Sequence, residues 1–171
     1  QRQMCIRDSL VLVICKTEGH LDQSLLARNI LNEKNGPPPE VNLFNEKNNG
    51  ESILNLIDKG YVKSAHDISL GGLLVAISKM CIRGNKGIKI NKSKNLINEI
   101  EYFFAEDQGR YLIEVNKEDL KEVTKILNKN SVHHEELGII TQNDMIINEK
   151  TKVTIDELKS YYTNWLTKYM S

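Results

Sequence analysis

The stretch SAHDISLGG, residues 64–72, carries the residue types best suited to chemistry in this chain. Asp67 follows a short β-prone run, and a carboxylate at the carboxyl end of a strand is the hard oxygen ligand that Mg²⁺ prefers. Ser69 and the backbone N–H groups of Gly71 and Gly72 precede an apolar helical pattern, so they would face an anion through a helix N-terminus. The order of these groups therefore predicts a phosphate and metal site with Asp67 as the metal ligand.

The same stretch has a purely structural alternative. Serine and aspartate are favoured helix N-caps, so Ser69 or Asp67 could simply begin the following helix. Glycines such as Gly71 and Gly72 also permit close packing between backbone segments. His66 stands beside the strand end, where an imidazole is more often a structural hydrogen-bonding group than a proton carrier. From the residues alone, both interpretations stay open.

A second polar cluster consists of Glu106, Asp107 and Gln108, with Arg110 beyond Gly109. Two carboxylates and an amide on a turn before a strongly β-prone run could contact a hydroxylated substrate or a metal. The structural alternative, which we prefer, is that the cluster holds a neighbouring surface. In that arrangement Arg110 would form a bidentate pair with a carboxylate.

The remaining histidines and the cysteines do not add a site. His133 and His134 lack a third ligand at metal-binding spacing, and we expect them on an exposed edge strand. Cys5, Cys15 and Cys81 are odd in number and form no CxxC pair, which fits neither a disulfide framework nor a zinc site. Cys81 lies in an apolar helical run, so it should behave as a small hydrophobic residue. This cysteine usage favours a reducing cytoplasm.

The composition limits the molecule to one domain without a nucleic-acid or membrane role. Its 171 residues are enough for one hydrophobic core. Lys plus Arg and Asp plus Glu number 23 each, and the basic residues are scattered, which disfavours nucleic-acid binding. No apolar run approaches the roughly 20 residues that span a bilayer.

Strand and helix patterns alternate along the chain, which predicts an α/β or α+β fold in two layers, a mixed sheet with helices packed on it. Strands are expected at 10–16, 61–67, 87–91, 110–115, 133–141 and 144–148, and helices at 22–32, 42–59, 72–83, 95–105, 117–130 and 154–169. The strands 133–141 and 144–148 should pair around a turn at Gln142 and Asn143. Gly60 should end the second helix, and Thr154 should cap the last.

The helices should differ in burial. The helix 72–83 is apolar nearly all round and should be the most buried. The other two helices that precede it should each bury one face, made of Leu25, Leu26, Ile30 and Leu31 in 22–32 and of Leu43, Phe44, Ile53, Leu54 and Ile57 in 42–59.

The first nine residues, QRQMCIRDS, have no hydrophobic period and resemble translated sequencing-adapter sequence. We therefore treat residues 1–9 as a non-native extension that packs against nothing. Residues 10–171 are then expected to form a single domain.

Several stretches in this order and spacing resemble one family. They are GHLDQSLLARNIL, GPPPEVNLFNEKNNG, VKSAHDISLGGLLVAISKM, AEDQGRYLIEV and LGIIT. Together they look like the C-terminal end of the synthetase subunit of phosphoribosylformylglycinamidine synthase, from purine biosynthesis. The resemblance runs from about Leu10 to Ser171.

The resemblance implies a fold, an activity and partners. Members of this family have two pseudo-equivalent halves, each with a C-terminal α/β domain of the aminoimidazole-ribonucleotide-synthetase type. They use ATP, Mg²⁺ and ammonia from glutamine to convert formylglycinamide ribonucleotide to its amidine, with a glutaminase subunit and a small accessory subunit. This chain would be the last domain. The family's catalytic histidine would lie in the upstream domains, so no catalytic residue is assigned here and the isolated chain should be inactive.

The resemblance also carries over to single residues. The positions matching Asp67 and Ser69 lie at a nucleotide, ATP or ADP, held in the second half of larger relatives. The tripeptide matching residues 106–108 lies against the substrate in the first half. Leu70 departs from the pattern, because an aspartate usually precedes the Gly-Gly pair. The change removes a negative charge and makes ion binding by this half less favourable.

Two alternative functions stay open. The chain could be a non-catalytic domain that completes the fold, holds a structural nucleotide and docks a glutaminase. It could also be a fragment of a sister family, aminoimidazole-ribonucleotide synthetase or selenophosphate synthetase. The runs EDQGRY and GPPPEV favour the first assignment over the sister families.

Overall fold

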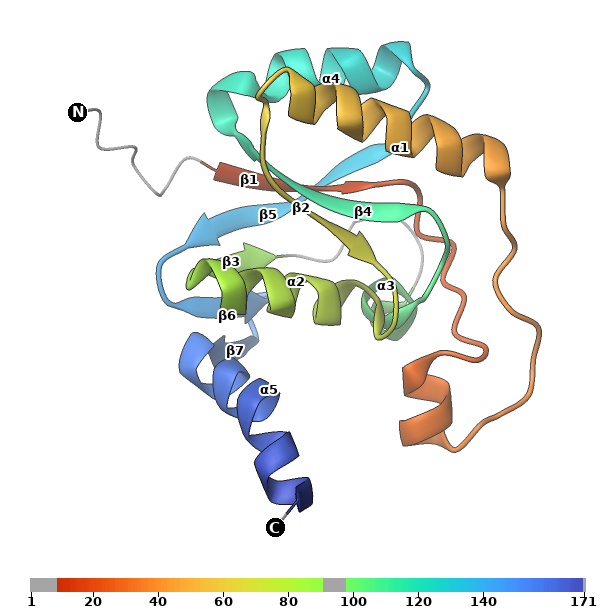
Figure 1. Cartoon of the computed structure of the whole chain (residues 1–171), viewed down its shortest axis with the longest axis vertical. Coiled ribbons are helices and arrows are strands. Elements are labelled where there is room, and N and C mark those ends of the chain that lie inside the picture. Colours follow the sequence, from red (N-terminus) through yellow and green to blue (C-terminus); the bar gives the residue numbers. More distant parts are fainter. Residues whose placement is uncertain (1–8, 91–97, 171) are drawn as a thin grey trace.

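A seven-stranded mixed sheet forms the centre of the computed structural model, which describes residues 9–90 and 98–170 (Figure 1). The strands are β1 (Ser9–Ile14), β2 (Val62–Ile68), β3 (Gly87–Ile90), β4 (Arg110–Asn116), β5 (His134–Thr141), β6 (Asp144–Ile147) and β7 (Thr151–Thr154). Their order across the sheet is β2-β4-β1-β5-β3-β6-β7. The neighbouring strands are antiparallel apart from β3 and β6, which are parallel.

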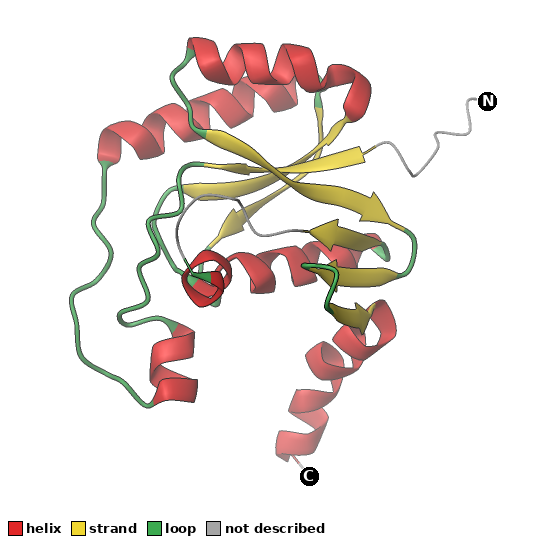
Figure 2. Ribbon diagram, turned by 180° about the vertical axis from the view of Figure 1, so that it is seen from behind, coloured by secondary structure: helices red, strands yellow, loops and turns green. Residues whose placement is uncertain are grey.

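Helices cover both faces of this sheet (Figures 1 and 2). The helices of the described residues are η2 (Ala27–Leu31), which lies beside the sheet, α1 (Leu43–Asp58), α2 (Gly72–Gly84), α3 (Glu99–Phe104), η3 (Lys117–Asp119), α4 (Leu120–Lys129) and α5 (Ile155–Met170). Helices α1 and α4 lie on one face, and α2, α3 and α5 lie on the other. The expected α/β class with a mixed sheet is confirmed, but the sheet is the middle of three layers and not one of two.

Strand β1 is buried on both sides, as a strand in the middle of three layers should be. All six of its residues are buried, because its side chains alternate between two apolar cores. Leu12 and its same-face neighbours pack against Leu56 of α1 and Leu127 of α4, in what we call the α1–α4 core. Val11 and Val13 point the other way, into the α2 core.

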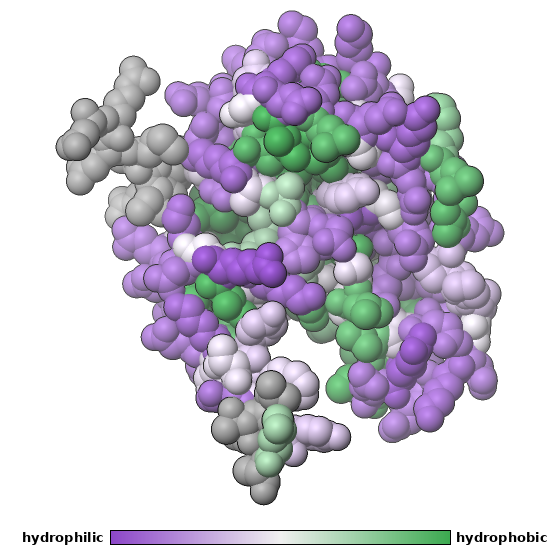
Figure 3. Space-filling model, in the orientation of Figure 1, coloured by the Kyte–Doolittle hydropathy of each residue, from purple (hydrophilic) through white to green (hydrophobic). Residues whose placement is uncertain are grey.

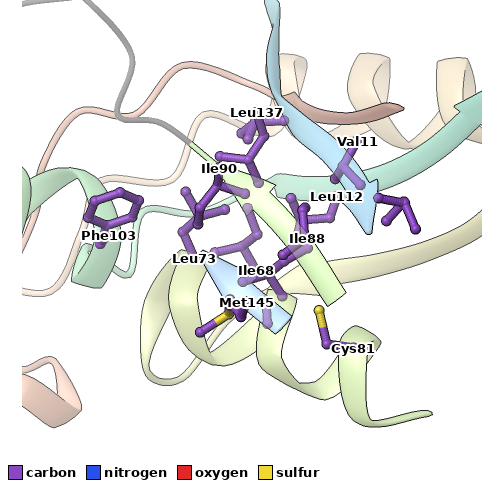
Figure 4. Close-up of a cluster of buried hydrophobic side chains, with 14 of the residues drawn as sticks. Val11, Ile68, Leu73, Cys81, Ile88, Ile90, Phe103, Leu112, Leu137 and Met145 are labelled. Carbon is purple, nitrogen blue, oxygen red and sulfur yellow. The ribbon is translucent and has the colours of Figure 1, made fainter. Parts of the chain in front are cut away.

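The α2 core is built around the helix with the strongest apolar character (Figure 4). Leu73, Ala76, Ile77 and Cys81 of α2 are each at most 4% exposed, which confirms the predicted burial of this helix. Burial raises the pKa of the Cys81 thiol to about 12, because the thiolate would lose its hydration. Cys81 therefore serves as a small hydrophobic residue.

Helix α1 lies where the sequence predicts it but buries a different face. Ile53 and Leu56 are the apolar residues that face the sheet, at 6% and 0% exposure. The exposed apolar residues, which the prediction placed inward, are Leu43, Phe44, Leu54 and Ile57. The first turns of α1 extend past the strands (Figure 1), so the sheet cannot cover Leu43 and Phe44.

Two predicted helix boundaries are confirmed by their hydrogen bonds. Gly60 has φ +75°, and the N–H groups of Gly60 and Tyr61 close the end of α1 on Ile57 O and Leu56 O, at 2.9 and 3.1 Å. Thr154 begins α5 through a reciprocal pair, since Glu157 N–H donates to Thr154 Oγ1 and Thr154 N–H donates to Glu157 Oε2.

The predicted pairing of the strands around Gln142 and Asn143 is wrong. Strand β3 lies between β5 and β6, with Ile88 opposite both Ile140 and Met145. The link between β5 and β6 crosses the end of β3 at Gly87, where any Cβ would overlap the backbone of Asp144. Only glycine leaves room for this crossing. The turn at residues 142 and 143 therefore carries the chain past β3 to its far side, and β5 and β6 do not form a hairpin.

The sheet order also differs from the prediction in two other ways: it contains a further strand, and His133 and His134 are not at an edge strand. Strand β7, a short exposed run that the sequence did not indicate, pairs with β6 at the sheet edge. Strand β5 lies between β1 and β3, so the expectation of an edge strand for His133 and His134 is wrong.

The helix predicted at 22–32 is present but shorter. Residues 25–31 are helical, most of them in the π-helix η2, and Gln23 and Asn32 have positive φ values of 62° and 56° on either side. Ala27 is the buried residue of η2, while Ile30 and Leu31 are exposed.

The first strand begins one residue earlier than expected, at Ser9. Ser9 pairs with Asn116 and is 4% exposed, so the expectation that residues 1–9 pack against nothing is wrong for Ser9. Residues 1–8 lie outside the described residues. Within residues 9–90 and 98–170, no helix is long and apolar enough to cross a bilayer.

Candidate functional site

A polar cleft of about 610 Å³ lies between the segment after β1, the start of α1 and the turn before β4. Its lining residues include Lys16, Glu18, His20, Asn45, Gln108 and His133. These residues come from four separate segments. The cleft therefore exists only in the folded chain.

Asp107 fixes one wall of this cleft. Its carboxylate is 6% exposed and accepts the backbone N–H groups of Glu18, Gly19 and His20, at 3.1, 3.3 and 3.0 Å. Three N–H donors on one buried carboxylate replace the water that burial removes. Asp107 thus holds the segment after β1 in place, and its oxygens are occupied by the chain's own backbone.

Arg110 lies behind Asp107 and is 1% exposed. It donates to Thr17 Oγ1 at 2.7 Å and to Ala105 O at 3.3 Å, and its one contact with Asp107 is 3.5 Å long. The predicted bidentate pair is wrong, because the backbone donors already hold the Asp107 carboxylate. Burial lowers the pKa of Arg110 and the charge of Asp107 opposes that change, but a guanidinium keeps its proton in proteins.

Glu106 occupies the N-terminus of α2. Its Oε1 accepts the N–H groups of Gly71 and Leu25, both at 2.8 Å, while Gly72 N–H donates to Ser69 O at 2.9 Å. A carboxylate from the chain itself therefore takes the position that was predicted for a phosphate. The N–H groups of Gly71 and Gly72 are both bonded within the chain.

The Gly-Gly pair is required by packing. Gly71 and Gly72 have φ values of +87° and +70°, which side chains rarely adopt. A Cβ on Gly72 would also lie 2.7 Å from Phe104 C and 2.8 Å from Ala105 O. The predicted role of the glycines in close packing is confirmed.

The predicted capping by Ser69 or Asp67 is wrong, since Gly71 is the N-cap of α2 and no side chain caps it. Ser69 is exposed. The hydrogen bond from Gly71 N–H to Glu106 takes the place of that cap.

Asp67 lies on the edge strand β2, with its side chain 64% exposed. Its neighbour Ile68 points into the α2 core, so Asp67 points to the opposite face of the sheet, beside Tyr111. Its recorded partner is His66, with Nδ1 3.3 Å from Oδ1. Among the residues that the structure describes, no group of three or more His, Cys, Asp or Glu could hold a metal ion.

The amides at the start of α1 also line the cleft, although the sequence did not lead us to predict them. Asn42 caps the helix by accepting Asn45 N–H at 3.0 Å, and the buried Asn49 donates to Gly109 O at 3.1 Å. All three asparagines line the cleft. Their spacing of three and four residues on one helical face was the signal that could have indicated it. Amides and carboxylates of this kind hydrogen-bond a polar ligand or a polar protein surface.

Comparison with known sequences identifies a family for this chain and relatives that are much longer than it is. Residues 8–148 match the family described as AIR synthase related protein, C-terminal domain. Phosphoribosylformylglycinamidine synthase subunit PurL of Pelagibacter ubique is 65% identical over 163 residues, which are 95% of this chain and 22% of that protein. The chain thus spans about a fifth of the length of the curated relatives that it matches.

Solved structures share the fold. PurL of Thermotoga maritima complexed with FGAR superposes with a TM-score of 0.73 at 17% identity, over 89% of this chain and 28% of that chain. The same protein complexed with ATP gives a TM-score of 0.66 at 15% identity, over 89% and 26%. At these identities the likeness extends to the fold alone.

Proposed function

This chain belongs to the AIR synthase related family, whose C-terminal domain it forms, and we propose that it is the last domain of the synthetase subunit of phosphoribosylformylglycinamidine synthase. The observation that carries the proposal is the 65% identity across 95% of the chain to one such subunit. This identity favours that subunit over the sister families, aminoimidazole-ribonucleotide synthetase and selenophosphate synthetase.

The whole protein would then be an ATP-dependent ligase. ATP would phosphorylate the formamide oxygen of formylglycinamide ribonucleotide, and ammonia from glutamine would displace the phosphate. Such chemistry depends on Mg²⁺ and on oriented N–H donors around the transferred phosphoryl group. The upstream domains would carry the catalytic residues. The isolated chain is therefore expected to be inactive, and its cytoplasmic location stays a prediction.

A nucleotide contact at Asp67, Ser69, Gly71 and Gly72 forms the finer part of the proposal. It requires the phosphate to displace Glu106 from Gly71 N–H, and Mg²⁺ at Asp67 to take its other ligands from phosphate, water or upstream residues. Calorimetry of ADP and Mg²⁺ binding to the full-length protein tests it. Asp67→Asn should weaken the binding, and an unchanged affinity would remove Asp67 from the site.

The second candidate is a non-catalytic domain that completes the fold and docks the glutaminase and accessory subunits. The hydrogen bond between Glu106 and Gly71 favours it, because an anion site filled by the chain's own carboxylate needs no nucleotide. This role and the ligase assignment are compatible, since a structural domain can belong to a catalytic subunit.

A chimera tests the main proposal. Residues 9–171 of this chain would replace the matching segment of the Pelagibacter ubique subunit, and amidine formation would be measured with formylglycinamide ribonucleotide, ATP, Mg²⁺ and ammonia. We expect activity within about tenfold of the parent, since the two sequences are 65% identical over the matched residues. A folded chimera without activity would contradict the assignment.

The isolated chain is the matched control in the same assay. It should form no amidine and hydrolyse no ATP. Turnover by the chain alone would contradict the placement of the catalytic residues in the upstream domains.

A further inference from the structure

Apolar side chains are exposed around η2 and the start of α2. They are Leu25, Ile30, Leu31 and Leu70, at 37%, 68%, 50% and 62% exposure, and we call them the η2 surface. In Figure 3 a narrow strip of green apolar side chains lies right of centre, near the start of α2 and η2 in Figure 1, and purple side chains border it on the right. A contiguous apolar surface on a protein is a mark of an interaction site.

Glu106 joins the two parts of this surface. The N–H groups of Leu25 and Gly71 both donate to Glu106 Oε1 at 2.8 Å, so Leu25 and Leu70 belong to neighbouring stretches of backbone. The Glu106 carboxylate thus satisfies a backbone hydrogen-bond donor in each stretch. The residues exposed on the outside are the apolar ones of the η2 surface together with the polar Arg28, Asn29 and Ser69.

The backbone that presents the η2 surface is fixed by polar contacts. Gln23 Nε2 donates to Lys34 O at 2.8 Å and to Gly36 O at 3.1 Å, which closes the loop on both sides of η2. His20 Nε2 lies 3.0 Å from Pro37 O. The segment is therefore held in shape while Leu25, Ile30 and Leu31 stay exposed. A surface fixed in this way loses little conformational entropy on binding.

We propose that the η2 surface binds the upstream part of the same polypeptide, which precedes Ser9 in the whole protein; this rests on the proposed function. The relatives are several times as long as this chain, and the matched region makes up 22% of their length. The rest of such a polypeptide would be a large, covalently attached partner. The apolar spacing of residues 25–31 is that of a buried face, yet the described residues of this chain leave it uncovered. The attached partner supplies the missing cover.

Cysteine labelling tests the proposal in the chimera described above. Ile30→Cys would be introduced both into the isolated chain and into the chimera, and its reaction with a maleimide would be followed by peptide mass mapping. Ile30 is 68% exposed here, so the isolated chain should react quickly. In the chimera we expect the rate to fall by about tenfold or more, because the partner covers the site.

The matched control is Lys125→Cys on α4, whose side chain is 75% exposed and lies on the other face of the sheet. It should react at about the same rate in both proteins. Equal rates for Ile30→Cys in an active chimera would overturn the proposed docking and leave the proposed function standing. Equal protection at both positions would overturn the assignment to the η2 surface.

Two other occupants give different results. If the surface joins two copies of this chain, labelling of Ile30→Cys in the isolated chain should slow as its concentration rises, which would overturn the proposal. Protection in the chimera that appears only with ADP and Mg²⁺ would assign the surface to a ligand and would overturn it too. An inactive chimera that still protects Ile30→Cys would contradict the proposed function alone.

Discussion

Two carboxylates of this chain, Asp107 and Glu106, accept hydrogen bonds from its own backbone. Asp107 and Glu106 together accept five backbone N–H groups, from residues 18–20, Leu25 and Gly71. Charge-assisted hydrogen bonds of this kind are stronger than neutral ones. They connect segments that lie between 35 and 89 residues apart in the sequence. Acidic residues that could serve a substrate or a metal are thus used here to hold the walls of a cleft.

Asp107→Asn should destabilise the chain by about 2–4 kcal/mol. The amide removes the charge beside the buried Arg110 and accepts the backbone N–H groups more weakly. Urea unfolding would measure the change. The control is Glu51→Gln, an exposed partner of Lys47 at 3.7 Å, which should cost less than about 0.5 kcal/mol. Similar losses for both variants would contradict the buried role of Asp107.

Cys81 should make the stability depend on alkaline pH. Burial raises the pKa of its thiol from 9.0 to about 12, so above pH 9 the unfolded chain releases a proton that the folded chain keeps. Stability present below pH 9 is then lost by about 1.4 kcal/mol per pH unit up to pH 12. Urea unfolding of Cys81→Ala should show a smaller decline between pH 9 and 10.5. Identical slopes in variant and parent would speak against the buried thiol.

At the scale of the elements, α2 shows how one helix can be read correctly and its first turn incorrectly. Its apolar run predicts a buried helix, since residues on every side are apolar, and the α2 core confirms it. Its Gly-Gly start is shared by phosphate sites and by close backbone crossings. The approach of Phe104 and Ala105 to Gly72 decides between them.

Gly72→Ala should therefore destabilise the chain by about 2–4 kcal/mol, through a positive φ and a clash with the backbone at Phe104. Gly84→Ala is the matched control at the other end of α2, where a Cβ would meet nothing within 4 Å. It should be neutral or up to about 1 kcal/mol more stable, because alanine favours the helix. Thermal melting compares the two, and a harmless Gly72→Ala would refute the packing requirement.

At the scale of the whole molecule, two strands link the cores: β4, with Leu112 in the α2 core and Ile113 in the α1–α4 core, and β1. Their alternate side chains belong to the α1–α4 core and to the α2 core, so neither core can lose its packing while the other keeps these strands in place. Cooperative unfolding of both faces follows from these shared strands.

Leu56→Ala and Ile77→Ala, one in each core, should each lower the stability by about 2–4 kcal/mol and keep a single unfolding transition. Leu54→Ala on the exposed side of α1 should cost less than about 0.5 kcal/mol. Far-ultraviolet circular dichroism suits this measurement, since Trp165 is 60% exposed and reports poorly on either core. Two separate transitions in either core variant would show that β1 and β4 do not couple the faces.

The sequence by itself determined the properties that depend on local pattern. Apolar runs identified β1 and α2, and a strongly β-prone run identified β4. Gly60 correctly predicted the end of α1, and Thr154 correctly predicted the start of α5. The quoted motifs also identified the family, because several ordered stretches at fixed spacing are far more specific than any one of them.

The tertiary structure decided what depends on distant neighbours. Only the fold shows that β3 separates β5 from β6 and that Leu56 of α1 faces the sheet in place of Leu54. It alone brings Glu106 to Gly71, 35 residues away in the sequence, and fills the predicted anion site. Spacing along a chain fixes which groups share a face, but hydrogen-bond partners are set by packing between segments, which no local pattern encodes.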